Sequence, residues 1–339
     1  MLEFTIGLPG PFGTWCAAVV ARLAGPTAGP LPVISANTLD QISRSLIGRG
    51  TSQAVISPRE PSGRLRAELS AAGRRFIVST EDPRAVFGHL VANGLDARET
   101  VRAVASSCAA VIGCIDAPGA LTLRADWEGL DPLAAAAAIA SHLGLPANEA
   151  EIAPILDDLA RDGIVPAGEN WTTFWAELGK AERAMALGAI APYLRAFNGE
   201  AFEPLSWAPL LFTTGEEPGQ PVLGPIDITG RARCLFRGPD ILVPPGAWSL
   251  WLGLSFSTEA VEHEYLVEIS GCAGASSISV QPERPGQLQG RVDFIVDETA
   301  DEPISIRFMS RRAAFDGILT LITATVAPRP DAPETATRG

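Results

Sequence analysis

The apolar residues of this chain follow one pattern before Asn198 and a different pattern after it. Before Asn198, short apolar runs alternate with alanine-rich segments in which apolar residues recur at helical spacing, and the runs lie at residues 4–6, 54–56, 76–78 and 121–123. This alternation predicts an α/β fold with a mostly parallel sheet covered on both faces. After Asn198, short runs of β-branched and aromatic residues are separated by turn residues, which predicts an all-β antiparallel sandwich.

The same change of pattern predicts the domain boundaries. We expect an α/β domain over residues 1–205, a linker over 206–222 where prolines are frequent and no helical period persists, and a β-sandwich domain over 223–327. The tail at 328–339 is polar and proline-rich, so we expect it to be disordered. A length of 339 residues agrees with two cores, because each domain is large enough to bury its own apolar surface.

The clearest single helix is predicted after Asp131, where an alanine-rich apolar run follows and Gly144 can end the helix. Asp126 and Glu128 precede it. Acidic residues at this place are most simply capping residues and partners of the helix dipole.

Composition excludes several classes of function. The net charge is −13 and the arginines are scattered, so we expect no nucleic-acid partner. The five cysteines form no Cys-x-x-Cys pair and the three histidines lie far apart, so we expect neither a disulfide framework nor a metal site. No apolar run approaches the roughly 20 residues of a membrane span, and the N-terminus lacks a secretory pattern. We therefore expect a cytoplasmic protein.

The first candidate site is the segment GLPGPFGTW at residues 7–15, between an apolar strand and a helix. Backbone N–H groups and a helix N-terminus at such a turn can hold a phosphate. The candidate cofactor-binding residues are Gly10, Pro11, Phe12, Gly13, Thr14 and Trp15. The segment has no lysine of the kind found in nucleotide triphosphatases, and a tight turn of this composition is also common for structural reasons. Both interpretations stay open at this point.

Three segments together resemble the sulfotransferase family. GLPGPFGTW resembles the loop that binds the 5′-phosphosulfate, RRFIVSTEDPRAVFGHL resembles the signature that holds the 3′-phosphate, and LRADWEGLDPLAAAAAIASHLGLP resembles a later acidic element followed by a helix. Their order and separation also agree with that family, over residues 1–212. The resemblance implies a P-loop-type sulfotransferase fold that would use 3′-phosphoadenosine 5′-phosphosulfate.

This sequence departs from the family at the charged positions. The family's loop arginine or lysine falls on Gly10, and the arginine of the second signature falls on Glu81. A carboxylate that faces a phosphate pocket repels the donor, and lost charge-assisted hydrogen bonds weaken its binding by several powers of ten. The resemblance therefore implies a degenerate, non-catalytic binding or assembly component, linked to bacterial glycan or envelope metabolism.

A divergent sulfotransferase that acts on a glycan or small-molecule hydroxyl is the alternative. It would bind the donor through the backbone N–H groups of the loop, with Arg84 on a phosphate and His89 as the catalytic base. Each residue also has a structural interpretation, since Arg84 and His89 can be surface residues and Thr14 can be an N-cap.

The second candidate site lies in the predicted sandwich. Trp248 and Trp251 are aromatic residues of the kind that stack on sugar rings when they lie on an exposed face, and they are core residues otherwise. The expected partners are a glycan or a protein, and a third class, a structural protein that forms homo-oligomers through its sandwich, also stays open.

Overall fold

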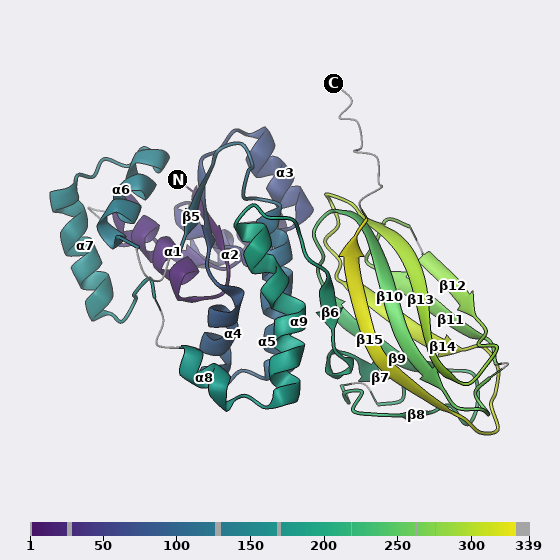
Figure 1. Ribbon diagram of the computed structural model, residues 1–339. Coiled ribbons are helices and arrows are strands. Elements are labelled where there is room, and N and C mark those ends of the chain that lie inside the picture. The colour runs from purple at the N-terminus through teal and green to yellow at the C-terminus, as the bar shows by residue number, and fades with distance from the viewer. Residues whose placement is uncertain are drawn as a thin grey trace. The chain divides into compact units, whose positions relative to one another are not determined.

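The computed structural model describes residues 2–25, 29–125, 130–167, 171–217, 219–261, 263–274 and 276–329. The chain divides into two compact units. The first consists of Met1–Gly179 with Phe197–Gly199, and the second of Lys180–Ala196 with Glu200–Gly339. In Figure 1 the first unit contains a small sheet surrounded by helices, whereas the second is made mostly of strands.

The first unit contains a five-stranded sheet in the order β2-β3-β1-β4-β5, and every pair in it is parallel. Its strands are β1 (Leu2–Gly7), β2 (Val33–Ile34), β3 (Ala54–Ile56), β4 (Phe76–Thr80) and β5 (Ala120–Arg124). Its helices are α1 (Pro11–Ala24), α2 (Leu39–Arg49), α3 (Gly63–Ala71), α4 (Pro83–Ala92), α5 (Ala97–Ile112), α6 (Pro132–Leu143), α7 (Glu149–Arg161) and α8 (Trp171–Glu177). The parallel sheet predicted from the alternating pattern is confirmed.

Strand β1 lies in the middle of this sheet, between β3 and β4. The chain leaves β1 on one side to form β2 and β3, and then crosses to the other side to form β4 and β5. The carboxyl ends of β1, β3 and β4 therefore meet where the strand order reverses, and in parallel α/β sheets ligands bind at such a point. Ile6, Val55 and Ile77 are completely buried in the strands and form the core beneath this edge.

The helix ends follow the signals in the sequence. Asp131 caps α6 by accepting hydrogen bonds from the N–H groups of Leu133 and Ala134, and Gly144 ends the helix in the left-handed conformation with φ 69°. The helix expected after Asp131 is thus confirmed. Asp126 and Glu128 lie outside the described residues.

The second unit contains α9 (Lys180–Phe197) and two antiparallel sheets. One sheet has the order β13-β10-β15-β6, with β8 also paired to β15, and the other has the order β12-β11-β14-β9-β7. Their strands are β6 (Leu205–Trp207), β7 (Thr213–Thr214), β8 (Ile226–Asp227), β9 (Cys234–Ile241), β10 (Gly246–Phe256), β11 (Tyr265–Ser270), β12 (Ser276–Val280), β13 (Gly286–Val296), β14 (Ile304–Ser310) and β15 (Ile318–Pro328). The antiparallel sheets expected after Asn198 are confirmed (Figure 1).

The predicted linker at 206–222 needs a correction. Part of it belongs to the sheets, because β6 pairs with β15 and β7 pairs with β9. The short helix η1 (Pro209–Leu211) lies between them, and Phe212 and Val222 are buried. Strands of two or three residues carry no detectable period, so the prolines dominated the sequence pattern.

The outer boundaries also differ from the prediction. Helix α9 was expected in the α/β domain, but most of it belongs to the second unit, where Tyr193 contacts Phe202 with a ring-centroid distance of 5.1 Å. The expected tail starts too early, because Pro328 pairs with Trp248 in the sheet. Residues 330–339 lie outside the described part of the chain.

Candidate functional site

The turn between β1 and α1 holds a buried carboxylate. Glu81 follows β4 and is 3% exposed. Its Oε1 accepts a hydrogen bond from the N–H of Gly13 at 3.3 Å, and its Oε2 accepts one from the N–H of Phe12 at 3.5 Å. These N–H groups belong to the loop that the sequence predicts to hold a phosphate. A side chain of the protein therefore occupies the place of the expected anion.

Burial raises the pKa of the Glu81 carboxyl group to about 7. The N–H groups of Gly13 and Phe12 and the positive charge of Arg59 act in the opposite direction, but the cost of burying the charge is larger. The carboxyl group therefore titrates near neutral pH. The turn between β1 and α1, called the cradle below, therefore contains a group whose charge changes with pH in the physiological range.

Arg59 is the cation of this site, and sequence reasoning missed it. It follows β3, and its guanidinium donates to the backbone oxygen of Leu8 at 2.5 Å and to Oγ1 of Thr14 at 3.5 Å. Burial lowers the pKa of this guanidinium, although the charge of Glu81 opposes the change. Only the parallel topology reveals Arg59, because it brings the end of β3 next to the end of β1.

Gly10 and Gly13 of the loop are required because other atoms of the protein lie too close to them for a side chain. A Cβ atom on Gly10 would lie 2.4 Å from Oε1 of Glu81, and a Cβ atom on Gly13 would lie 2.5 Å from the backbone oxygen of Leu8. Both distances are far below van der Waals contact. Gly10 therefore has no room for a side chain while Glu81 accepts hydrogen bonds from the loop.

The other loop side chains have structural contacts. Phe12 and Trp15 are buried and stack with a centroid distance of 5.8 Å, so both rings belong to the core of the first unit. The hydroxyl of Thr14 donates to the backbone oxygen of Gly10 at 2.9 Å, inside the first turn of α1. Pro11 is the first residue of that helix, where its fixed φ angle is favourable.

Arg84 and His89 lie at different ends of α4. Arg84 is in the first turn and forms an ion pair with Asp82 at 2.6 Å. His89 is in the last turn, where its Nε2 lies 3.5 Å from the side-chain nitrogen of Asn93. Five residues of helix separate the two by about 7 Å along the axis. Among the described residues, the structure records no contact that joins His89 to the loop.

The tryptophans proposed for glycan binding lie in different environments. Trp248 is 4% exposed, its indole N–H donates to the backbone oxygen of Pro244 at 2.9 Å, and its ring packs edge-on against Phe202. Trp248 is therefore a core residue, and its assignment as a glycan contact is wrong. Trp251 points to the other face of β10 and is half-buried, with the guanidinium of Arg291 5.2 Å from the ring centre.

The chain was compared with known proteins. No protein-family model and no curated protein matches it. Solved structures with low similarity include a TmCBM61 complex with beta-1,4-galactotriose, with 10% identity and a TM-score of 0.25 over 30% of this chain and 67% of that one. A family 16 carbohydrate-binding module has 11% identity and a TM-score of 0.24 over 34% of this chain and 82% of its own. A family 11 carbohydrate-binding module of a Clostridium thermocellum cellulase has 10% identity and a TM-score of 0.21, over 39% of this chain and 88% of its own.

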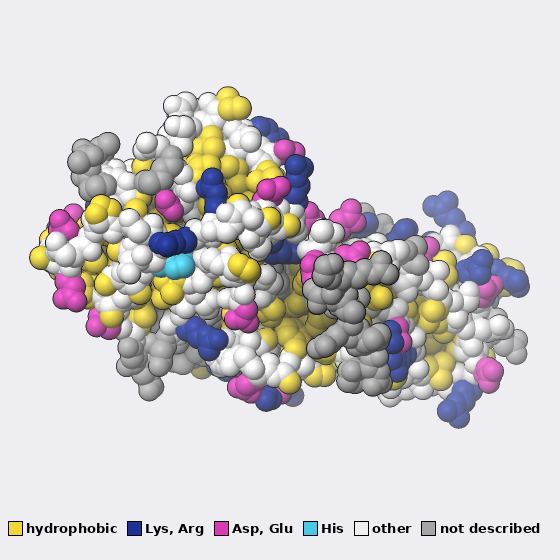
Figure 2. All heavy atoms as spheres, turned by 90° about the horizontal axis from the view of Figure 1, so that it is seen from above, with side chains coloured by type: hydrophobic (Ala, Val, Ile, Leu, Met, Phe, Trp, Pro, Cys, Tyr) yellow, Lys and Arg dark blue, Asp and Glu magenta, His cyan; other side chains and the backbone are white. Residues whose placement is uncertain are grey.

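The described residues give further information about partners. No helix among them is long and apolar enough to cross a membrane. Within the same residues, no cluster of three or more histidine, cysteine or acidic side chains could hold a metal ion. On the face drawn in Figure 2, basic and acidic side chains are interspersed.

Proposed function

We propose that this protein is a sulfotransferase-like binding or assembly component that has lost ordinary donor chemistry. The observation that supports the proposal is the Glu81 carboxylate on the N–H groups of Phe12 and Gly13. In the family that the sequence resembles, the same loop holds the 5′-phosphosulfate of the donor. Here an internal anion competes for that place.

The competition has two parts. The donor must first displace Glu81, whose tether to β4 keeps it at high local concentration beside the loop. If the displaced carboxylate stays nearby, it then repels the incoming phosphates, and Arg59 is the cation available to offset that charge. Both parts weaken donor binding without any change in the fold.

Calorimetric titration with adenosine 3′,5′-bisphosphate, the desulfonated donor, tests this proposal. We expect no binding to the unmodified chain at micromolar concentrations, and measurable binding to Glu81→Gln, which keeps the shape of the side chain and removes its charge. Glu68→Gln is the matched control, because Glu68 is an exposed residue of α3. Micromolar binding by the unmodified chain would instead support the alternative, a divergent sulfotransferase that uses Arg84 and His89.

A second activity is supported by the position of Trp251. Its half-buried ring lies on the outward face of the sheet β13-β10-β15-β6, opposite Arg291 on β13 and Thr325 on β15. The face of such a ring can stack on a sugar, and the polar side chains beside it can bind the sugar hydroxyls. We therefore propose a glycan partner for this face, although the sugar would share the ring with the guanidinium of Arg291.

A glycan array probed with the full chain tests the second activity. Trp251→Ala should abolish the signal, and Phe315→Ala is the matched control because it removes a fully exposed aromatic ring elsewhere in the same unit. Equal binding by both variants and the unmodified chain would place any glycan site elsewhere.

A further inference from the structure

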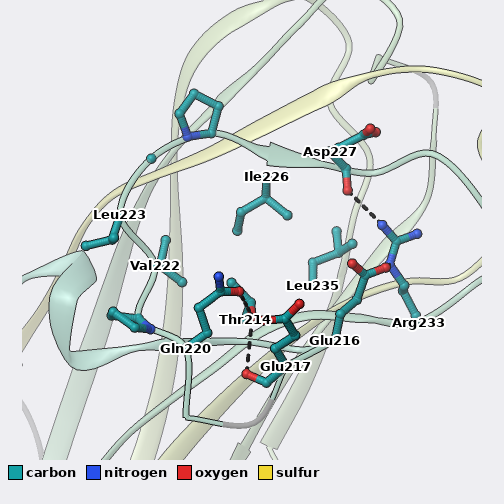
Figure 3. A pocket seen from close by; sticks show the side chains of 13 residues that line it. Thr214, Glu216, Glu217, Gln220, Val222, Leu223, Ile226, Asp227, Arg233 and Leu235 are labelled. Atoms are coloured by element: carbon teal, nitrogen blue, oxygen red, sulfur yellow. Dashed lines mark hydrogen bonds and ion pairs between the residues drawn. The ribbon is translucent and has the colours of Figure 1, made fainter.

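A cavity lies in the segment that is predicted from sequence to be a linker. It has a volume of about 290 Å³ and lies between β7, β8 and the start of β9. Its lining includes Thr214, Glu217, Gln220, Val222, Ile226 and Leu235. Figure 3 shows the apolar side chains and the polar ones around the same space. All of these residues belong to the second unit.

The acidic side chains of the lining outnumber the basic ones. Glu216, Glu217 and Asp227 are acidic, and Arg233 is the single cation. The guanidinium of Arg233 already has partners, because it pairs with Glu216 at 2.9 Å and donates to the backbone oxygens of Asp227 and Thr229, each at 2.7 Å. Arg233 therefore offsets one carboxylate and supports the wall of the cavity.

The remaining two carboxylates differ in their surroundings. Asp227 accepts a hydrogen bond from the N–H of Thr229 at 2.8 Å, so its charge is stabilised by its own turn. Within the described part of the chain, no hydrogen bond or ion pair is recorded for the Glu217 carboxylate. Its backbone oxygen, in contrast, is held by the N–H of Gln220 at 3.0 Å. Glu217 thus places a carboxylate acceptor at the edge of the cavity.

The floor of the cavity is apolar. Val222 and Leu235 are each 2% exposed, and the partly exposed side chain of Ile226 lines the same space. Apolar floor and acidic edge together favour a ligand with an alkyl stem and a cationic head, because the stem can cover the floor while the head reaches the carboxylates. The volume is at the lower end for ligand pockets, which limits the ligand to about one side chain in size.

We propose that this cavity binds a primary ammonium group on an alkyl stem, provided either by a small polyamine or by a lysine side chain of a protein partner. The stem contacts Val222 and Ile226, and the ammonium pairs with Glu217. Sulfated or carboxylated ligands are disfavoured, because they would meet an excess of negative charge. This site is independent of the loop beside Glu81 and of the face around Trp251.

The test follows backbone amide signals of the full ¹⁵N-labelled chain by NMR. The probes are 1,5-diaminopentane, N-α-acetyl-lysine amide and its N-ε-acetylated form, which keeps the stem but has no charge. The two amines should shift signals of residues 214–235 in a saturable way, and the ε-acetylated form should not. Tighter binding of the diamine indicates a polyamine ligand, and tighter binding of the lysine derivative indicates a protein partner.

Matched variants identify the acceptor. Glu217→Gln should weaken amine binding by about fivefold, as expected for loss of an exposed ion pair. Glu302→Gln makes the same change of charge just before β14 and should leave binding unchanged. The other end of this strand, Ser310, is the end that contacts Arg233. Equal binding of the ε-acetylated form, absence of saturable shifts in residues 214–235, or equal losses in the two variants would overturn the proposal.

Discussion

The buried carboxyl group of Glu81 should make the stability of this protein depend on pH in an unusual direction. Its pKa in the folded chain is raised to about 7 from an ordinary value of 4.5, so the folded state binds a proton that the unfolded state has already released. The contribution of this group to stability is therefore fully present below the unfolded pKa and is lost as the pH rises through the folded pKa. Ordinary paired carboxylates have the opposite effect.

The size of the effect follows from the same values. Between pH 4.5 and pH 7 the folded chain loses about 3 kcal/mol of unfolding free energy through this one group. Glu81→Gln has no proton to lose, so this part of the pH dependence disappears in the variant. The variant should match the unmodified chain near pH 5 and be more stable by up to about 3 kcal/mol at pH 8.

Urea unfolding of both proteins at several pH values measures the difference. Other groups with raised pKa values, such as Glu3 and Glu60, contribute equally to both proteins and cancel. A carboxyl ¹³C titration of Glu81 gives its pKa directly. A difference in unfolding free energy that stays constant from pH 5 to pH 8 would refute the reasoning, because it would mean that Glu81 is ionised throughout.

Three further outcomes are expected. Gly10→Ala should destabilise the chain by about 1–3 kcal/mol in thermal unfolding, because its Cβ would lie 2.4 Å from Oε1 of Glu81, and adding Glu81→Ala should restore much of the loss. Trp248→Ala should cost about 3–5 kcal/mol in urea unfolding, since it removes packing against Phe202 and a buried hydrogen bond, and a loss below 1 kcal/mol would contradict its place in the core. Arg59→Gln should raise the pKa of Glu81 further in the ¹³C titration, because the nearby positive charge is lost, and a lowered pKa would contradict the assigned contacts.

The sequence predicted the parts of the fold that depend on repeating patterns. The strands at 4–6, 54–56 and 76–78 stood out because they are short, apolar and separated by helical segments, and β1, β3 and β4 cover these residues. The linker at 206–222 was misread because β6 and β7 contain only three and two residues. Pairing with β15 and β9, which follow much later in the chain, decides their structure.

The candidate sites were predicted less completely than the fold. The sequence identified the turn at Gly10 and the unusual glutamate at position 81, but not Arg59, whose place beside the loop depends on the order of strands in the sheet. The two tryptophans looked equivalent in sequence. Their three-residue separation places Trp248 and Trp251 on opposite faces of one strand, so only Trp251 lies on the outward face.

Glu81 also changes the physical reason for the expected loss of donor binding. The sequence suggested a carboxylate that repels phosphate across an open pocket. In the structure the carboxylate instead accepts hydrogen bonds from the N–H groups of the loop itself. A strand-turn-helix cradle leaves N–H groups without partners when no anion is bound. The internal carboxyl group of Glu81 accepts from two of them, so this loop needs no bound anion to hold its shape.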